Sequence, residues 1–157
     1  MMGPGMAKVP SITQTFYIAS PPARVYSALT SPRQLTKWFL EKATIAPRVD
    51  SAFEFTWQGG YTMKGRVRDA VPRRRLELDW IDVFEGGKKF QTSVRFVLRR
   101  KGRGTLVTMT HRGFKSGRKW IALYGAINSG WAYYLANLKS VLEHGNDLRS
   151  RYDSIAG

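Results

Sequence analysis

The stretch from Trp120 to Leu142, WIALYGAINSGWAYYLANLKSVL, decides the fold. Its apolar residues recur at the 3.6-residue period of an α-helix and form one stripe about 120° wide. The stripe contains Trp120, Tyr124, Ile127, Trp131, Tyr134, Leu135, Leu138, Val141 and Leu142. Ser116 and Gly145 supply a start and a stop signal. We therefore predict a helix from Arg118 to His144, about 40 Å long, which needs a broad apolar partner.

The residues before this helix supply that partner, because their apolar pattern mostly has a period of two. Ser11 to Ala19 predicts a first strand whose buried side carries Ile12, Phe16 and Ile18. Two short helical segments follow, started by Ser20 with Pro21 and by Ser31 with Pro32. The remaining predicted strands are 41–46, 52–57, 61–71, 75–81, 90–99 and 105–111.

Glycine pairs separate several of these strands. Gln58-Gly59-Gly60 and Glu85-Gly86-Gly87-Lys88 lie between strands, so they predict hairpin turns rather than phosphate-binding loops. Most strands have one apolar face, as expected for an antiparallel sheet that is covered on one side. We predict an α+β fold in which a curved antiparallel sheet wraps around the long C-terminal helix and two short helices close one end. The expected division is a flexible leader at 1–10, one domain at 11–147 and a tail at 148–157.

Composition restricts the classes of function. The chain of 157 residues has no cysteine, which excludes disulfides, thiolate nucleophiles and cysteine-ligated metals. It lacks a run of eighteen apolar residues and an apolar signal-peptide core, so we expect a cytoplasmic protein. The net charge of +15 would attract polyanions or an acidic partner, although a basic proteome or a preference for solubility is the simpler explanation.

Several short motifs also occur in a specific order along the chain. They include Ala19-Ser20-Pro21-Pro22-Ala23-Arg24-Val25, Gly65-Arg66-Val67, Thr110-His111-Arg112-Gly113-Phe114 and Gly130-Trp131. Together these motifs resemble the SRPBCC superfamily (START and birch-pollen-allergen-like), and within it the branch named for activators of the heat-shock protein 90 ATPase. The resemblance extends from Ile12 to Gly145 and implies a helix-grip fold with a cavity between helix and sheet.

The resemblance does not imply one function. The superfamily includes lipid and hormone binders, polyketide cyclases and subunits of aromatic-ring dioxygenases. This chain departs from the pattern in a basic loop that contains Arg112, Lys115, Arg118 and Lys119. Because that loop would border the cavity mouth, the type of ligand cannot be carried over from relatives.

His111 is the most attractive single residue for chemistry. By strand alternation it points toward the helix, as Val107 and Met109 do, so it could anchor a polar group or act as an acid–base. A lone histidine lacks the partner that such catalysis needs, and a hydrogen bond to a neighbouring loop is the simpler interpretation.

The carboxylates do not predict hydrolytic chemistry either. Glu54, Glu77 and Asp79 fall on the outward phase of their strands, and no inward pair can divide acid and base roles. No cluster has the spacing of metal ligands. We therefore predict no catalytic residue, no metal and no cofactor.

Aromatic and methionine side chains converge on the space between helix and sheet. Core packing explains most of them, but such side chains are also typical of pockets for flat apolar ligands. The residues predicted to line a ligand cavity are Trp57, Met63, Trp80, Phe96, Met109, His111, Phe114, Trp120, Tyr124, Ile127 and Trp131. The aromatic half of the helix, 120–131, is expected to touch the ligand, and the aliphatic half, 134–142, to hold the core.

Basic residues line the outward face of the predicted sheet. They are Lys64, Arg66, Arg68, Arg95 and Arg99. No outward aromatic accompanies them, so we do not expect specific nucleic-acid binding.

Three functional hypotheses result. The first is a non-enzymatic domain whose internal cavity binds a small hydrophobic or aromatic ligand. The second is a co-chaperone or stress-response module that docks on a chaperone or another acidic protein. The third, least favoured, is a cyclase or lyase that uses His111.

Overall fold

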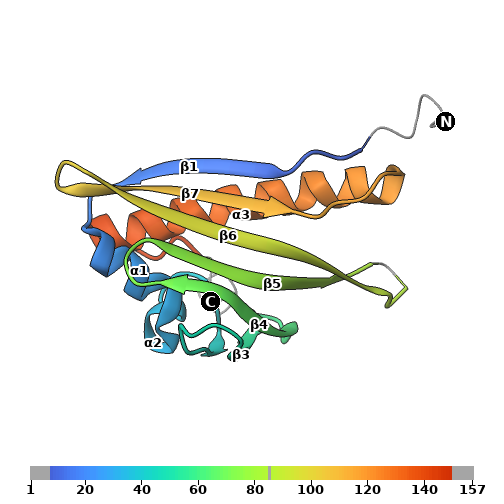
Figure 1. Ribbon diagram of the computed structural model, residues 1–157, viewed down its shortest axis with the longest axis horizontal. Coiled ribbons are helices and arrows are strands. Elements are labelled where there is room, and N and C mark those ends of the chain that lie inside the picture. The colour runs from blue at the N-terminus through green and yellow to red at the C-terminus, as the bar shows by residue number, and fades with distance from the viewer. Residues whose placement is uncertain (1–7, 85, 150–157) are drawn as a thin grey trace, which may run out of the picture.

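The computed structural model describes residues 8–84 and 86–149. The elements in chain order are β1 (Ile12–Ile18), α1 (Pro22–Thr30), α2 (Pro32–Leu35), β2 (Lys42–Thr44), β3 (Ala52–Thr56), β4 (Thr62–Val71), β5 (Arg75–Val83), β6 (Lys89–Lys101), β7 (Gly104–Arg112) and α3 (Arg118–His144). Seven antiparallel strands form one sheet in the order β1-β7-β6-β5-β4-β3-β2. Figure 1 shows α3 lying along this sheet, with α1 and α2 at one end. The predicted α+β helix-grip architecture is therefore confirmed.

The long helix has the predicted ends, 118–144. Its N-cap is Gly117 rather than Ser116, and no side chain caps it. At the other end Gly145 adopts a left-handed conformation with φ 68°, which favours glycine, and its N–H donates to the carbonyl oxygens of Ser140 and Val141. The left-handed conformation of Gly145 thus explains why the helix ends where the sequence predicted.

The start of α1 differs from the prediction. Pro21, not Ser20, is the N-cap, and the carbonyl oxygen of Pro21 accepts the first helical bonds from Arg24 and Val25. The backbone N–H of Ser20 instead donates to Ile18, so Ser20 lies in a turn outside the helix. At α2 the predicted cap is confirmed, because the Ser31 hydroxyl accepts a bond from the N–H of Gln34.

The core is unevenly distributed along α3. Leu135 and Leu138 are fully buried against the sheet, and Trp131, Asn137 and Leu142 are buried with them. From 121 to 130, all of which the structure describes, no side chain is buried. One half of the helix is therefore packed core, and the other half covers the sheet loosely.

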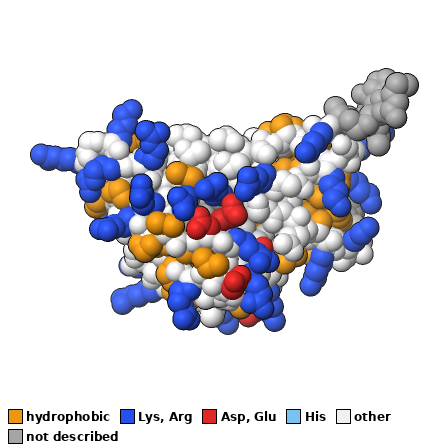
Figure 2. Space-filling view, in the orientation of Figure 1, with side chains coloured by type: hydrophobic (Ala, Val, Ile, Leu, Met, Phe, Trp, Pro, Cys, Tyr) orange, Lys and Arg blue, Asp and Glu red, His pale blue; other side chains and the backbone are white. Residues whose placement is uncertain are grey.

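The outer face of the sheet is only partly exposed to solvent. Asp79 has the outward phase predicted for it but is 6% exposed. The Arg68 guanidinium donates to both carboxylate oxygens of Asp79, and the Gln91 amide donates to one of them. Asp79 therefore keeps its outward phase, but long side chains from the neighbouring strands cover it. Figure 2 shows Lys and Arg side chains spread over the visible face.

The terminal residues that the structure describes pack on the domain. Lys8, placed in the leader by the sequence, forms an isolated bridge with Ser116, and Val9 is buried. The Arg149 guanidinium donates to the carbonyl oxygens of Leu40 and Thr36. Residues 1–7 of the leader and 150–157 of the tail lie outside the described residues. No helix between 8 and 149, residue 85 aside, is long and apolar enough to cross a membrane.

Candidate functional site: a groove beside the long helix

A small hollow lies between α3 and the sheet. Its lining consists of Phe39, Trp57, Trp80, Asp82, Ile127, Gly130, Trp131 and Tyr134, and its volume is about 130 Å³. We call it the aromatic cleft, because five of these residues carry aromatic rings. It lies where the superfamily resemblance implies a cavity.

A second hollow of about 250 Å³ lies further toward the N-terminus of α3. Its lining consists of Phe84, Lys119, Ala122, Leu123 and Ala126. The two hollows are neighbours along the helix, since Ala126 lines one and Ile127 lines the other. We refer to both together as the helix groove.

The sequence of α3 explains why the groove is open. The residues that α3 contributes are spaced by one, three or four along the helix from Lys119 to Tyr134, so they share a face. Ala122, Ala126 and Gly130 recur every four residues on that face and fill little space. A Cβ atom added at Gly130 would meet no other atom within 4 Å. The opposite wall comes from β5 and the residue after it, where Trp80, Asp82 and Phe84 alternate toward the helix.

The rings of the aromatic cleft brace one another. Phe39 meets Trp57 edge to face with ring centroids 5.4 Å apart, and it meets Tyr134 in the same way at 4.9 Å. The centroids of Trp80 and Trp131 are 5.1 Å apart. Edge-to-face and offset contacts of this kind hold the rings in fixed orientations. The cleft therefore presents preformed ring surfaces to a ligand.

Asp82 is a wall residue of the aromatic cleft that was not predicted from the sequence. Its place on β5, two residues after Trp80, turns it toward the helix, and burial raises the pKa of its carboxyl group above the usual value. The Tyr61 hydroxyl lies 3.5 Å from Asp82 Oδ1, and this hydrogen bond partly opposes that rise in pKa. The predicted strand ended at Ile81. Continuing the alternation of Leu76, Leu78 and Trp80 by one step would have placed this carboxylate inward.

His111 lies beneath the cleft in the packed core and is fully buried. The indole Nε1–H of Trp131 donates to His111 Nδ1 at 3.0 Å, so Nδ1 is an acceptor. The ring proton is then on Nε2, which donates to the Thr92 hydroxyl at 2.7 Å, and that hydroxyl donates to the Trp80 carbonyl oxygen at 3.1 Å. Burial lowers the pKa of His111 to about 3. Both nitrogens of the neutral ring are thus occupied, which leaves neither free for acid–base chemistry.

The predicted lining residues divide into three groups. Trp57, Trp80, Ile127 and Trp131 line the aromatic cleft. Met63, Phe96, Met109 and His111 are packed in the interior below it. The third group is near the start of α3, where Trp120 packs on Phe84 and Phe90, while Tyr124 packs on Phe114. The cleft is also lined by four residues that were not predicted from the sequence: Phe39, Asp82, Gly130 and Tyr134.

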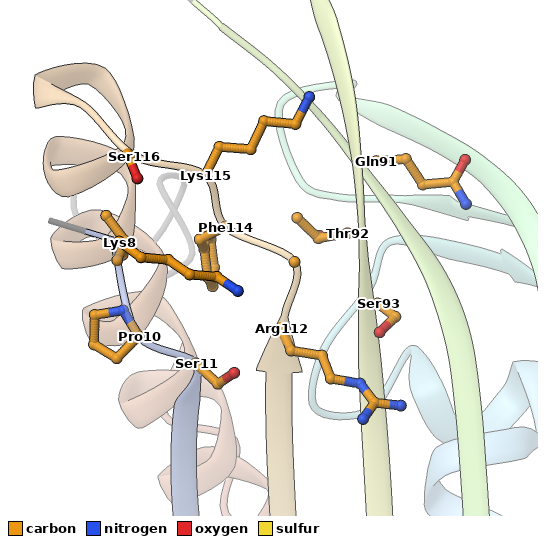
Figure 3. A pocket seen from close by; sticks show the side chains of 12 residues that line it. Lys8, Pro10, Ser11, Gln91, Thr92, Ser93, Arg112, Phe114, Lys115 and Ser116 are labelled. Atoms are coloured by element: carbon orange, nitrogen blue, oxygen red, sulfur yellow. The ribbon is translucent and has the colours of Figure 1, made fainter. Parts of the chain in front are cut away.

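A larger and more polar hollow lies where the chain leaves β7. Its volume is about 1100 Å³, and Figure 3 shows Lys8, Arg112 and Lys115 around it with Ser11 and Ser93. We call it the basic hollow. The structure places Arg112 and Lys115 of the basic loop here rather than at the mouth of the aromatic cleft, whereas Lys119 lines the helix groove.

No group of three or more potential metal ligands occurs within residues 8–84 and 86–149. The groove itself offers the rings and the Asp82 carboxylate of the aromatic cleft and the Lys119 ammonium group of the second hollow.

Comparison with known proteins identifies the family. The family model described as activator of Hsp90 ATPase homolog 1-like protein matches residues 19–143. The chain belongs to this family. No curated protein matches the sequence.

Solved structures share the fold over most of the chain. A protein of Mesorhizobium loti is 22% identical with a TM-score of 0.77, and the match covers 87% of this chain and 99% of that one. The Aha1 dimer of Colwellia psychrerythraea is 26% identical with a TM-score of 0.73, covering 88% and 99%. CalU16 of Micromonospora echinospora is 25% identical with a TM-score of 0.65, covering 90% and 84%.

Proposed function

We propose that this protein is a non-enzymatic binding domain that takes a small hydrophobic or aromatic molecule into the helix groove. One observation carries the proposal: a ring-lined hollow lies between α3 and the sheet, beside the turns of α3 that bury no side chain. Preformed apolar clefts with few polar groups are the usual form of small-molecule sites.

The energetics of such binding are favourable. A ligand that removes about 200 Å² of apolar surface from water gains about 5 kcal/mol before the cost of association. Trp57 and Tyr134 are only half-buried, so their rings have surface left for a ligand to cover. Ligand rings would pack edge to face against the existing pairs, which adds orientation to the hydrophobic gain.

The state of His111 supports a binding role over catalysis. Its ring is neutral, fully buried and hydrogen bonded at both nitrogens. A catalytic acid–base needs access to the proton that it transfers. This geometry disfavours the cyclase or lyase hypothesis based on this residue.

A ligand screen tests the proposal. Tryptophan fluorescence and thermal unfolding are recorded with fatty acids, flavonoids and polyketides. Gly130→Leu should fill the aromatic cleft and abolish binding of any hit, whereas Ala132→Leu on the exposed side of α3 should not. Binding that survives Gly130→Leu, or the absence of any hit, would overturn the proposal.

A second candidate function rests on the basic hollow. Lys8, Arg112 and Lys115 border a hollow large enough to receive an acidic segment of a partner, as the name of the family suggests for a chaperone. Arg112 is less available to a partner than the two lysines, because its guanidinium already forms an ion pair with Glu77 at 3.1 Å. Association with a purified chaperone should weaken in salt and on Lys115→Glu, but not on the remote change Lys37→Glu. Equal binding by both variants would exclude this hollow as the docking site.

A further inference from the structure

Asp82 has no Lys or Arg partner among residues 8–84 and 86–149, although the protein is rich in basic residues. Lys and Arg outnumber Asp and Glu by 26 to 11. Among the carboxylates within residues 8–84 and 86–149, those that are buried or half-buried pair with Lys or Arg, with Asp82 as the exception. The pairs are Arg75–Asp69, Arg112–Glu77, Arg68–Asp79, Lys139–Glu143 and Arg149–Asp147.

The surroundings of Asp82 match an organic cation. The carboxylate shares the aromatic cleft with the rings of Phe39, Trp57, Trp80, Trp131 and Tyr134. Ring faces attract a cation placed within about 6 Å of their centroids, and tryptophan does so most strongly. A carboxylate beside several such rings supplies the countercharge as well. Cages of aromatic rings recognise quaternary and methylated ammonium groups in this way.

The size of the cleft also fits a compact head group. Its volume of about 130 Å³ is close to that of an engineered cavity of about 150 Å³ in another protein, which binds benzene. A trimethylammonium group is similarly compact. The neighbouring hollow of about 250 Å³ can take an apolar remainder of the ligand.

Local charge favours a cation despite the positive net charge. The basic residue that lines the helix groove is Lys119, which borders the second hollow rather than the aromatic cleft. The polar neighbour of Asp82 is a phenol, because the Tyr61 hydroxyl lies 3.5 Å from its Oδ1, and this hydroxyl is closer, at 3.1 Å, to the carbonyl oxygen of Ile81. An incoming ammonium group would give the carboxylate the opposite charge that no described side chain provides.

We propose that the ligand of the aromatic cleft carries an ammonium group, preferably quaternary, held between the aromatic rings and the carboxylate of Asp82. This inference rests on the proposed function, because it names the chemical class of the molecule that enters the same groove. Asp82 is then the residue that sets specificity, and the rings supply most of the contact area.

Two probes of equal shape test the inference. Choline and 3,3-dimethylbutan-1-ol differ in that a carbon atom replaces the charged nitrogen. Binding is measured by calorimetry and by the NMR signals of the tryptophan indole N–H groups. We expect choline to bind the unmodified protein at least tenfold more tightly than the neutral alcohol.

Variants locate the effect. Asp82→Asn keeps the shape of the side chain and should lower choline affinity at least tenfold while leaving the neutral alcohol unchanged. Glu54→Gln removes the same charge from an exposed position and should leave both affinities unchanged. A thermal unfolding curve for each variant verifies that the fold is intact.

The outcomes separate this inference from the proposed function. Equal affinity for the two probes overturns the ammonium inference while the groove remains a site for neutral ligands. The ammonium inference also fails if neither probe binds but a neutral aromatic compound binds in a Gly130-dependent way. If neither probe binds and the wider screen gives no hit, both proposals fail.

Discussion

Between Trp131 and Leu142, α3 buries five side chains, whereas from Ile121 to Gly130 it buries none. Polar bonds show the same contrast. The C-terminal half donates from Asn137 to the Trp38 carbonyl oxygen and from Lys139 to that of Tyr17, while Glu143 accepts from the Ala19 N–H. In the N-terminal half the side-chain bond to the sheet is that of Gln14 to Asn128.

The difference teaches that one helix can divide two tasks along its length. The C-terminal half satisfies backbone groups at the end of β1, an edge strand whose free groups would otherwise invite pairing with another chain, through Lys139 to Tyr17 and Glu143 to Ala19. The N-terminal half leaves the helix groove open beside it, and Trp131 and Tyr134 complete the wall of the aromatic cleft. Regions that bury few apolar contacts open most easily, and binding segments are usually taken from such regions. The C-terminal half can therefore secure the fold without closing the groove.

The largest expected effect concerns His111, which hydrogen bonds to Trp131 where the two halves meet. Its pKa in the folded protein is about 3, compared with 6.5 for the unperturbed group. As pH falls below 6.5, His111 binds a proton in the unfolded chain but stays neutral in the folded chain. The stabilising contribution present above pH 6.5 is therefore lost between pH 6.5 and about 3, by up to about 5 kcal/mol.

Two measurements check this prediction. Urea unfolding from pH 7 to pH 3.5 should show a loss of stability that becomes shallower in His111→Gln. NMR of the ring should show a neutral imidazole with its proton on Nε2 down to pH 5. A ring that protonates near pH 6 in the folded protein would contradict the closed hydrogen-bond chain.

A matched pair of apolar truncations compares the halves directly. Leu138 is fully buried, so Leu138→Ala should lower the free energy of unfolding by about 3 kcal/mol. Ile127 is half-buried and borders the aromatic cleft, so Ile127→Ala should cost about 1 kcal/mol or less. Urea unfolding measures both. Similar losses at the two positions would mean that the N-terminal half packs as tightly in solution as the C-terminal half.

The helix and the sheet were predictable because their signals are local. The ends of α3 follow from an unbroken period of 3.6 residues and from Gly145, and the hairpins follow from glycine pairs. Strand alternation separated inward from outward residues well. It could not show that Asp79 is covered, since this depends on Arg68 and Gln91 reaching across from neighbouring strands.

The site was only partly predictable because it depends on where the helix crosses the sheet. Met109 and Trp80 are both inward residues, yet the first is packed in the core and the second lines the cleft. Phe39 enters the cleft from the segment after α2, and no periodicity in the sequence brings it there. Asp82 was missed for a simpler reason, since the predicted strand stopped at Ile81, two residues before β5 ends at Val83.

Replacing one asparagine in each half of α3 compares the two halves again, with smaller expected losses of stability. The Asn137 amide is fully buried, donates to the carbonyl oxygen of Trp38 and accepts from the N–H of Leu148. Asn137→Ala should cost about 1–3 kcal/mol, because it leaves buried polar groups without partners. Asn128→Ala should cost about 0.5 kcal/mol, since its partner Gln14 is half-exposed to water. Thermal or urea unfolding measures both losses of stability. A larger loss for Asn128→Ala than for Asn137→Ala would contradict the conclusion that the C-terminal half of α3 holds the fold.

The smallest expected effect separates stability from binding within the N-terminal half. Gly125 and Gly130 are helical glycines where an added Cβ meets no atom within 4 Å, so replacing either with Ala should raise stability by about 0.5–1 kcal/mol. Gly130 lines the aromatic cleft and Gly125 does not. Titration with a ligand from the screen should therefore show weaker binding for Gly130→Ala and unchanged binding for Gly125→Ala. If both substitutions weakened binding equally, the groove would depend on the flexibility that glycine gives this half of α3, rather than on the space beside Gly130.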